Sequence, residues 1–180
     1  MTRTLLSSAA LIALLLAACS TIPLPAPSSP PPLTTVTPEA MVATIRAAAA
    51  HDDSELAVQP LRDPRVEDLR QQAARLEATH RYAEAAAALD KALAIVSADI
   101  ASTDPALLQE RAEAAVLLKD YAGAEQFARH AHAIGAKVGP LCRRHWATVQ
   151  QMRRVAGDVA GAASAQAQLE ACKVAAPNRF

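Results

Sequence analysis

The chain has 180 residues, in which 18 lysines and arginines balance 18 aspartates and glutamates. This balance gives no electrostatic case for binding nucleic acid, which needs a basic surface. Hydrophobic residues make up 52% of the chain but aromatic residues only 3%, and alanine is abundant. Because alanine is the strongest helix former and lets helices approach closely, the composition predicts an all-α fold of packed helices.

Residues 1–18 have the layout of an export signal. Arg3 supplies positive charge, and the segment from Leu5 to Leu16 is apolar except for two serines. This segment is too short to remain as a membrane-spanning helix, so we expect it to be removed.

The end of this signal, Leu16-Ala17-Ala18-Cys19, resembles the lipobox of bacterial lipoproteins. The resemblance implies cleavage before Cys19 and lipidation of that cysteine. Ser20 follows, which is typical of lipoproteins sorted to the outer membrane and facing the periplasm. The alternative is a soluble periplasmic protein with an ordinary signal and an incidental cysteine.

Residues 19–37 are predicted to be a spacer. Beyond the cysteine they contain six prolines among serines and threonines, with no helical or strand periodicity. Such a segment favours extended polyproline geometry and reaches roughly 50 Å at about 3.1 Å per residue. A proline-rich ligand for a recognition domain is the alternative reading.

Residues 38–176 are long enough for one compact domain with one core. A first helix is predicted from Pro38 to about Ala50, with one apolar face formed by Met41, Val42, Ile45 and Ala49. Residues 51–61 interrupt the helical pattern, and residues 55–59 within them are either an extended segment or a loop.

Three further helix starts carry proline in the first turn, at Asp63-Pro64, Asp104-Pro105 and Gly139-Pro140. We expect each of them to open a pair of helices.

The second helices of these pairs contain a repeated pattern. It reads Arg81-Tyr82-Ala83-Glu84-Ala85, then Asp120-Tyr121-Ala122-Gly123-Ala124, then Asp158-Val159-Ala160-Gly161-Ala162, so the last alanine recurs every 38 or 39 residues. The pattern resembles the tetratricopeptide repeat, with units at about 64–97, 103–136 and 141–174. The third unit is degenerate, which is typical of a capping repeat. A generic alanine-rich helical bundle is the alternative.

The tetratricopeptide resemblance implies a short superhelix whose first helices line a concave groove for proteins or peptides. The groove positions carried over to this sequence are polar and mixed in sign, so a polar peptide surface is a more plausible ligand than an apolar molecule. The candidate groove residues are Glu67, Arg70, Glu77, Gln109, Glu113, Arg144, Gln151 and Arg154.

Two cysteines remain beside Cys19. Cys142 and Cys172 lie about fifteen residues before and after the expected turn at Gly157-Asp158, so antiparallel helices bring them level. In an oxidising compartment this spacing predicts a disulfide. The alternative is a redox or metal pair helped by His145, although a zinc site would lack a convincing fourth ligand.

No catalytic pattern is recognisable. The sequence has no glycine-rich phosphate loop and no nucleophile elbow, and His130 and His132 are expected on different helix faces. The arginine pairs at 143–144 and 153–154 are read as solvated surface, or as a contact for anionic lipid, glycan or an acidic partner.

We therefore expect a protein that is not an enzyme and has no cofactor or metal. It would act as a membrane-anchored scaffold or adaptor for an envelope protein or peptide. The alternatives are a structural, self-associating lipoprotein without a groove ligand, and an enzyme or glycan-binding accessory of wall metabolism.

Overall fold

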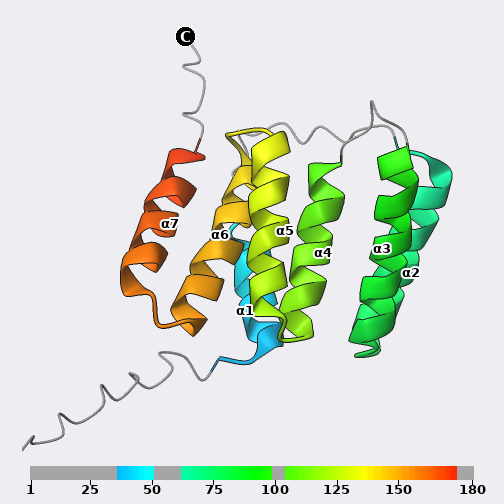
Figure 1. Ribbon diagram of the computed structural model, residues 1–180, viewed down its shortest axis with the longest axis horizontal. Helices are drawn as coiled ribbons and strands as arrows, with labels where there is room; N and C mark the ends of the chain where they lie inside the picture. Colours follow the sequence, from blue (N-terminus) through cyan, green and yellow to red (C-terminus); the bar gives the residue numbers. More distant parts are fainter. Residues whose placement is uncertain (1–35, 51–61, 99–103, 174–180) are drawn as a thin grey trace, which may run out of the picture. The chain divides into compact units, whose positions relative to one another are not determined.

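The computed structural model of the chain describes residues 36–50, 62–98 and 104–173. These residues form seven α-helices, and six of them pack as sequential antiparallel pairs: α2 with α3, α4 with α5, and α6 with α7 (Figure 1). The all-α prediction is therefore confirmed. The lipobox, Cys19, the spacer up to residue 35 and residues 55–59 lie outside the described residues. The helices are α1 (Pro38–Ala47), α2 (Pro64–Ala78), α3 (Tyr82–Ala98), α4 (Pro105–Leu117), α5 (Tyr121–Ile134), α6 (Pro140–Val155) and α7 (Val159–Ala171).

Helices α1, α2, α4 and α6 start at the predicted prolines, and three of them have a side-chain cap. Thr37, Asp63 and Asp104 each accept a hydrogen bond from a backbone N–H in the first turn. Proline fits directly after the cap because its missing N–H would have no partner inside the helix. Helix α6 differs, since it follows Gly139 with φ of 87° and has no side-chain cap.

The turns within the three pairs share a backbone conformation. His80, Lys119 and Gly157 all have positive φ, at 58°, 61° and 72°, and they stand at equivalent places in the repeat. Each residue ends the first helix of its pair in the left-handed conformation that is common at helix C-termini. Only the third unit uses glycine, the residue that adopts this conformation without steric cost.

The repeated Asp-x-Ala-Gly-Ala pattern has a structural explanation. Asp120 caps α5 by accepting from the Gly123 N–H at 3.0 Å, and Asp158 caps α7 in the same way through Gly161 at 2.7 Å. A Cβ atom on Gly123 would lie 2.2 Å from the Asp120 Oδ2 atom, so glycine leaves room for the cap. The repeat therefore encodes a helix start as well as a packing position.

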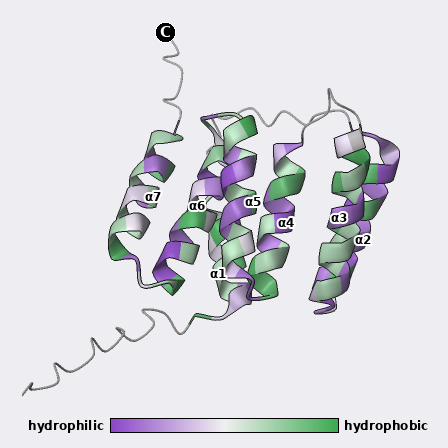
Figure 2. Cartoon of the chain, viewed as in Figure 1, coloured by the Kyte–Doolittle hydropathy of each residue, from purple (hydrophilic) through white to green (hydrophobic). Residues whose placement is uncertain are grey.

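The recurring alanines lie at close helix contacts. Ala85, Ala124 and Ala162 are 2%, 0% and 7% exposed. Small side chains at these positions let the two helices of a pair approach, and α3 then packs on α4 and α5 on α6. Hydrophobic and hydrophilic residues are mixed along the helices (Figure 2).

A disulfide joins Cys142, in the first turn of α6, to Cys172, the residue that follows α7. Their Cα atoms lie 5.7 Å apart, and the two residues are 0% and 1% exposed. The Gly139 N–H also donates to the Cys172 carbonyl at 2.7 Å. The predicted cysteine pairing is therefore present, and it closes the last helix pair at its open end.

Helix α1 packs against α4 and α6, the first helices of the second and third pairs. Met41, Val42 and Ile45 are at most 3% exposed and join a core cluster with residues of α4 and α6 that include Ala115, Val116, Ala147 and Met152. The predicted apolar face is thus buried, while Ala49, also expected there, is half-buried after the end of the helix.

Candidate functional site

A cavity of about 470 Å³ lies between the α2–α3 pair and the helices α1, α4 and α6. Buried side chains of small or moderate size form its apolar floor, while charged side chains and the exposed residues Gln71, Ala74 and Ala78 make up the rest. The floor residues are Ala73, Ala85, Leu89 and Ala114. The charged lining residues are Arg46, Glu67, Arg70, Glu77, Glu110 and Arg144.

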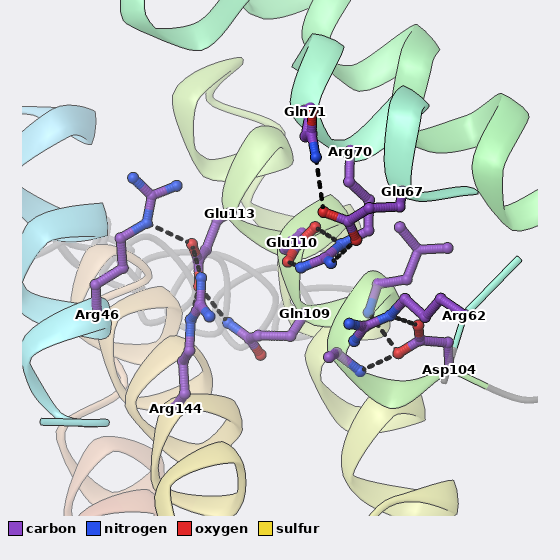
Figure 3. A network of polar contacts seen from close by, with 12 residues as sticks. Arg46, Arg62, Glu67, Arg70, Gln71, Asp104, Gln109, Glu110, Glu113 and Arg144 are labelled. Carbon is purple, nitrogen blue, oxygen red and sulfur yellow. Dashed lines mark hydrogen bonds and ion pairs between the residues drawn. The ribbon is translucent and has the colours of Figure 1, made fainter. Parts of the chain in front are cut away.

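Arg46 of α1 connects two sides of this cavity. Its Nη1 and Nη2 atoms donate to the two carboxylate oxygens of Glu77 on α2, at 2.7 and 3.0 Å. Its Nε atom donates to Glu113 on α4 at 2.8 Å. A planar guanidinium suits such a role because its donors point along fixed directions toward two carboxylates. Figure 3 shows Arg46 and Arg144 on opposite sides of Glu113.

Arg70 of α2 makes a second connection to α4. It donates through Nη1 to Glu67 at 2.8 Å, one helical turn away, and through Nε to Glu110 at 2.8 Å (Figure 3). Three arginines and three glutamates therefore line the cavity, and each arginine has a carboxylate partner. The cavity wall has no uncompensated charge that would select a strongly anionic or cationic ligand.

These ion pairs shift the pKa values of Arg46, Arg70 and Glu67. The strongest influence on Arg70 is its hydrogen bond to Glu110, which raises the pKa of the guanidinium. Burial lowers the pKa of Arg46, but its hydrogen bonds to Glu77 and Glu113 raise it by more, so the net shift is upward. The hydrogen bond from Gln71, helped by Arg70, lowers the pKa of Glu67. Arg46, Arg70 and Glu67 therefore stay charged through the neutral pH range.

A buried polar network lies beside the cavity, between α4 and α6. The Gln109 Nε2 atom donates to Glu113 Oε1 and to Thr148 Oγ1, both at 2.9 Å, and its Oε1 atom lies 2.8 Å from His145 Nδ1. Arg144 completes the network by donating through Nη2 to Glu113 at 2.6 Å. Glu113, Gln109, His145 and Thr148 are all 0% exposed. The network therefore satisfies a buried carboxylate from several sides and ties α4 to α6.

The structure divides the eight predicted groove residues into three groups. Four of them line the cavity: Glu67, Arg70, Glu77 and Arg144. Three are buried, with Gln109 and Glu113 at 0% and Gln151 at 7% exposure, so a docked partner does not reach them in this arrangement. Arg154 is exposed in the last turn of α6 and is not part of the cavity lining.

Sequence reasoning missed Arg46, Gln71 and Glu110 as lining residues. Arg46 comes from α1, which precedes the repeats, and nothing in the repeat pattern places it there. A local signal did exist for Glu110, because it follows Gln109 directly and precedes Glu113 by three residues on the same helix.

A second, smaller cavity of about 70 Å³ is lined by His132, His145 and Trp146, with side chains of α5 and α6 around them. The His132 ring centroid lies 5.0 Å from Trp146 and 6.5 Å from His145. Burial lowers the pKa of His145 to about 3, so this imidazole is neutral at physiological pH. Since Gln109 Oε1 can only accept, the proton sits on Nδ1, and the buried Nε2 atom has no partner.

Within residues 36–50, 62–98 and 104–173, no group of three or more His, Cys, Asp or Glu side chains is arranged to hold a metal ion. Among the same residues, no helix has both the length and the apolar character needed to cross a bilayer. Comparison with protein-family models, with curated proteins and with solved structures gives no significant match to this chain.

Proposed function

We propose that this chain is a lipid-anchored adaptor of the bacterial envelope that binds a segment of another protein. In this proposal Cys19 carries the anchor at the outer membrane, and residues 20–37 space the domain from it. The three helix pairs form a short tetratricopeptide-like superhelix. The cavity between the α2–α3 pair and α1, α4 and α6 is the observation that carries the proposal, and it receives the partner.

The lining of the cavity fits a polypeptide better than a strongly charged ligand. Its floor is made mainly of alanines, so it admits small apolar side chains, and the surrounding carboxylates and guanidiniums are already paired with one another. Paired charged groups keep free lone pairs and N–H donors that can bond to a peptide backbone. A partner segment with a small apolar residue flanked by polar residues satisfies both parts of this lining.

The binding step is tested by filling the cavity. Ala74 lines it and is exposed, whereas Gln72, two residues earlier on α2, is exposed and does not line it. We expect mild crosslinking in cells, followed by affinity purification, to capture one envelope protein with the wild type and the Gln72→Trp variant but not with Ala74→Trp. Equal capture by both variants would place the partner elsewhere. Recovery of nothing but further copies of the chain would replace the adaptor with the self-associating alternative.

The anchor is tested separately. Cells fed an alkyne-tagged fatty acid should label the wild-type chain, and the label should be absent from Cys19→Ala. Fractionation of the envelope should then find the labelled chain in outer membranes. A wild-type chain that stays unlabelled, or that is released with the soluble periplasmic fraction, is incompatible with the anchor.

A further inference from the structure

Helix α1 occupies a site made by the first helices of two successive pairs, α4 and α6. It inserts Met41, Val42 and Ile45, while Ala43 and Thr44 on its other side are exposed. The site therefore receives a helix through one apolar face with the spacing i, i+1 and i+4. In the chain, α1 precedes all three pairs and follows directly on the proposed spacer.

The same site also recognises polar groups near the C-terminal end of α1. Arg143 of α6 donates through Nε to the Ala48 carbonyl at 3.0 Å and through Nη2 to the Ala50 carbonyl at 3.3 Å. Glu113 accepts from Arg46, which directly follows the buried Ile45. Carbonyl groups at a helix C-terminus lack partners inside the helix, so an arginine aimed at them recognises a helix end of any sequence.

The helices that form the site also contact one another through residues other than those of α1. Besides Arg46, Glu113 accepts hydrogen bonds from Arg144 and Gln109. Helices α4, α5, α6 and α7 pack on one another directly, and the last pair is closed by the disulfide. By contrast, α1 has only ten residues, and a helix of that length is marginal in water unless it is docked. Its contacts to the first pair include the polar ones from Arg46 to Glu77 and from Tyr82 to Glu39, and Tyr82 also packs against the core cluster that contains Met41, Val42 and Ile45.

From these contacts we infer that α1 is a displaceable occupant of a helix-binding site, and that an amphipathic helix of a partner takes its place. The partner helix carries two or three apolar side chains in the spacing of Met41, Val42 and Ile45, followed by an arginine. This inference rests on the proposed adaptor function and names the chemistry of its partner. Release of α1 also removes Arg46 from the cavity wall, and the arginine of the partner helix takes its place there.

The probe is a fluorescent peptide with the sequence of residues 36–50, added to the purified chain from Cys19 onward with Cys19 replaced by serine. Ile45→Asp in the chain places a charge in the buried face of α1, whereas the matched control Ala43→Asp places it on the exposed face. We expect the Ile45→Asp chain to bind the peptide at least about tenfold more tightly than the control, because its own α1 no longer competes. A peptide that itself carries Ile45→Asp should not bind.

Equal peptide affinities for the two chains would overturn the inference. So would loss of helical circular dichroism across the whole Ile45→Asp domain, because α1 would then be an integral part of the core. Hydrogen exchange on the wild type gives a further readout: α1 amides should exchange about a hundredfold faster than amides of α4 and α6, and equal protection would contradict displacement. This experiment uses only the purified chain and the peptide. Its outcome therefore does not depend on whether a partner is captured in cells, so the inference and the proposed function can fail separately.

Discussion

Lowering the pH from 7 to 5 should destabilise the folded domain through His145. This side chain is 0% exposed, and burial lowers its pKa from 6.5 to about 3. In the unfolded chain the imidazole returns to its ordinary pKa, so between pH 6.5 and 3 the unfolded state binds more protons than the folded state. The contribution of His145 to stability is therefore fully present above pH 6.5 and is lost as the pH falls.

The size of this effect follows from the pKa difference. At pH 5 the imidazole is protonated in the unfolded chain but not in the folded one. Since pH 5 lies 1.5 units below the ordinary pKa of 6.5, and each unit corresponds to 1.36 kcal/mol, the free energy of unfolding falls by about 2 kcal/mol. Burial also lowers the pKa of His132, which adds an effect of the same sign.

Urea unfolding of the wild type and of His145→Gln at pH 7 and pH 5 measures the effect. The wild type should lose about 2 kcal/mol more than the variant on acidification, whatever the absolute stability of the variant. His132→Gln serves as the comparison for the second histidine of the small cavity. The reasoning is refuted if both chains lose the same stability, or if the His145 ring proton resonance in NMR titrates above pH 5.

Three further changes test other parts of the structure. Reduction of the Cys142–Cys172 disulfide, which spans 30 residues, should lower the free energy of unfolding by about 3 to 4 kcal/mol, and thermal melts with and without reductant measure it. Glu113→Gln should cost about 3 kcal/mol because it removes a fully buried carboxylate on which two arginines converge. Glu77→Gln, on a partly exposed pair, should cost at most about 1 kcal/mol in the same urea assay. Lys119→Gly should stabilise by roughly 0.5 to 1 kcal/mol by relieving a positive φ of 61°, and an unchanged or lower melting temperature would count against that strain.

Local signals in the sequence were enough to place the helices of the repeats. The prolines at 38, 64, 105 and 140 follow capping or turn residues, and the helices start at each of them. The aspartates at 120 and 158 and the glycines three residues later encode two more helix starts. Each of these signals acts within one helical turn, so it does not depend on how the helices pack together.

Such local signals did not predict how α1 packs or that Gln109 and Glu113 are buried. The apolar face of α1 is visible in Met41, Val42 and Ile45, but an amphipathic pattern does not say which helices cover it. Gln109 and Glu113 were predicted as groove positions from the tetratricopeptide resemblance, yet both are 0% exposed. Their burial is tolerated because residues distant in the sequence supply hydrogen bonds from every side, and a repeat pattern does not contain that information.

The disulfide between Cys142 and Cys172 also determines how the chain responds to a pulling force on its two ends. Tension that enters the last pair at Cys142 crosses the sulfur bridge to Cys172, so residues 143–171 are bypassed. When the domain is unfolded by force, the extended chain is therefore shorter by roughly 100 Å, at about 3.5 Å for each bypassed residue. The part of α6 on which α1 docks lies within this loop, so no direct tension acts on it while a load extends the other helices.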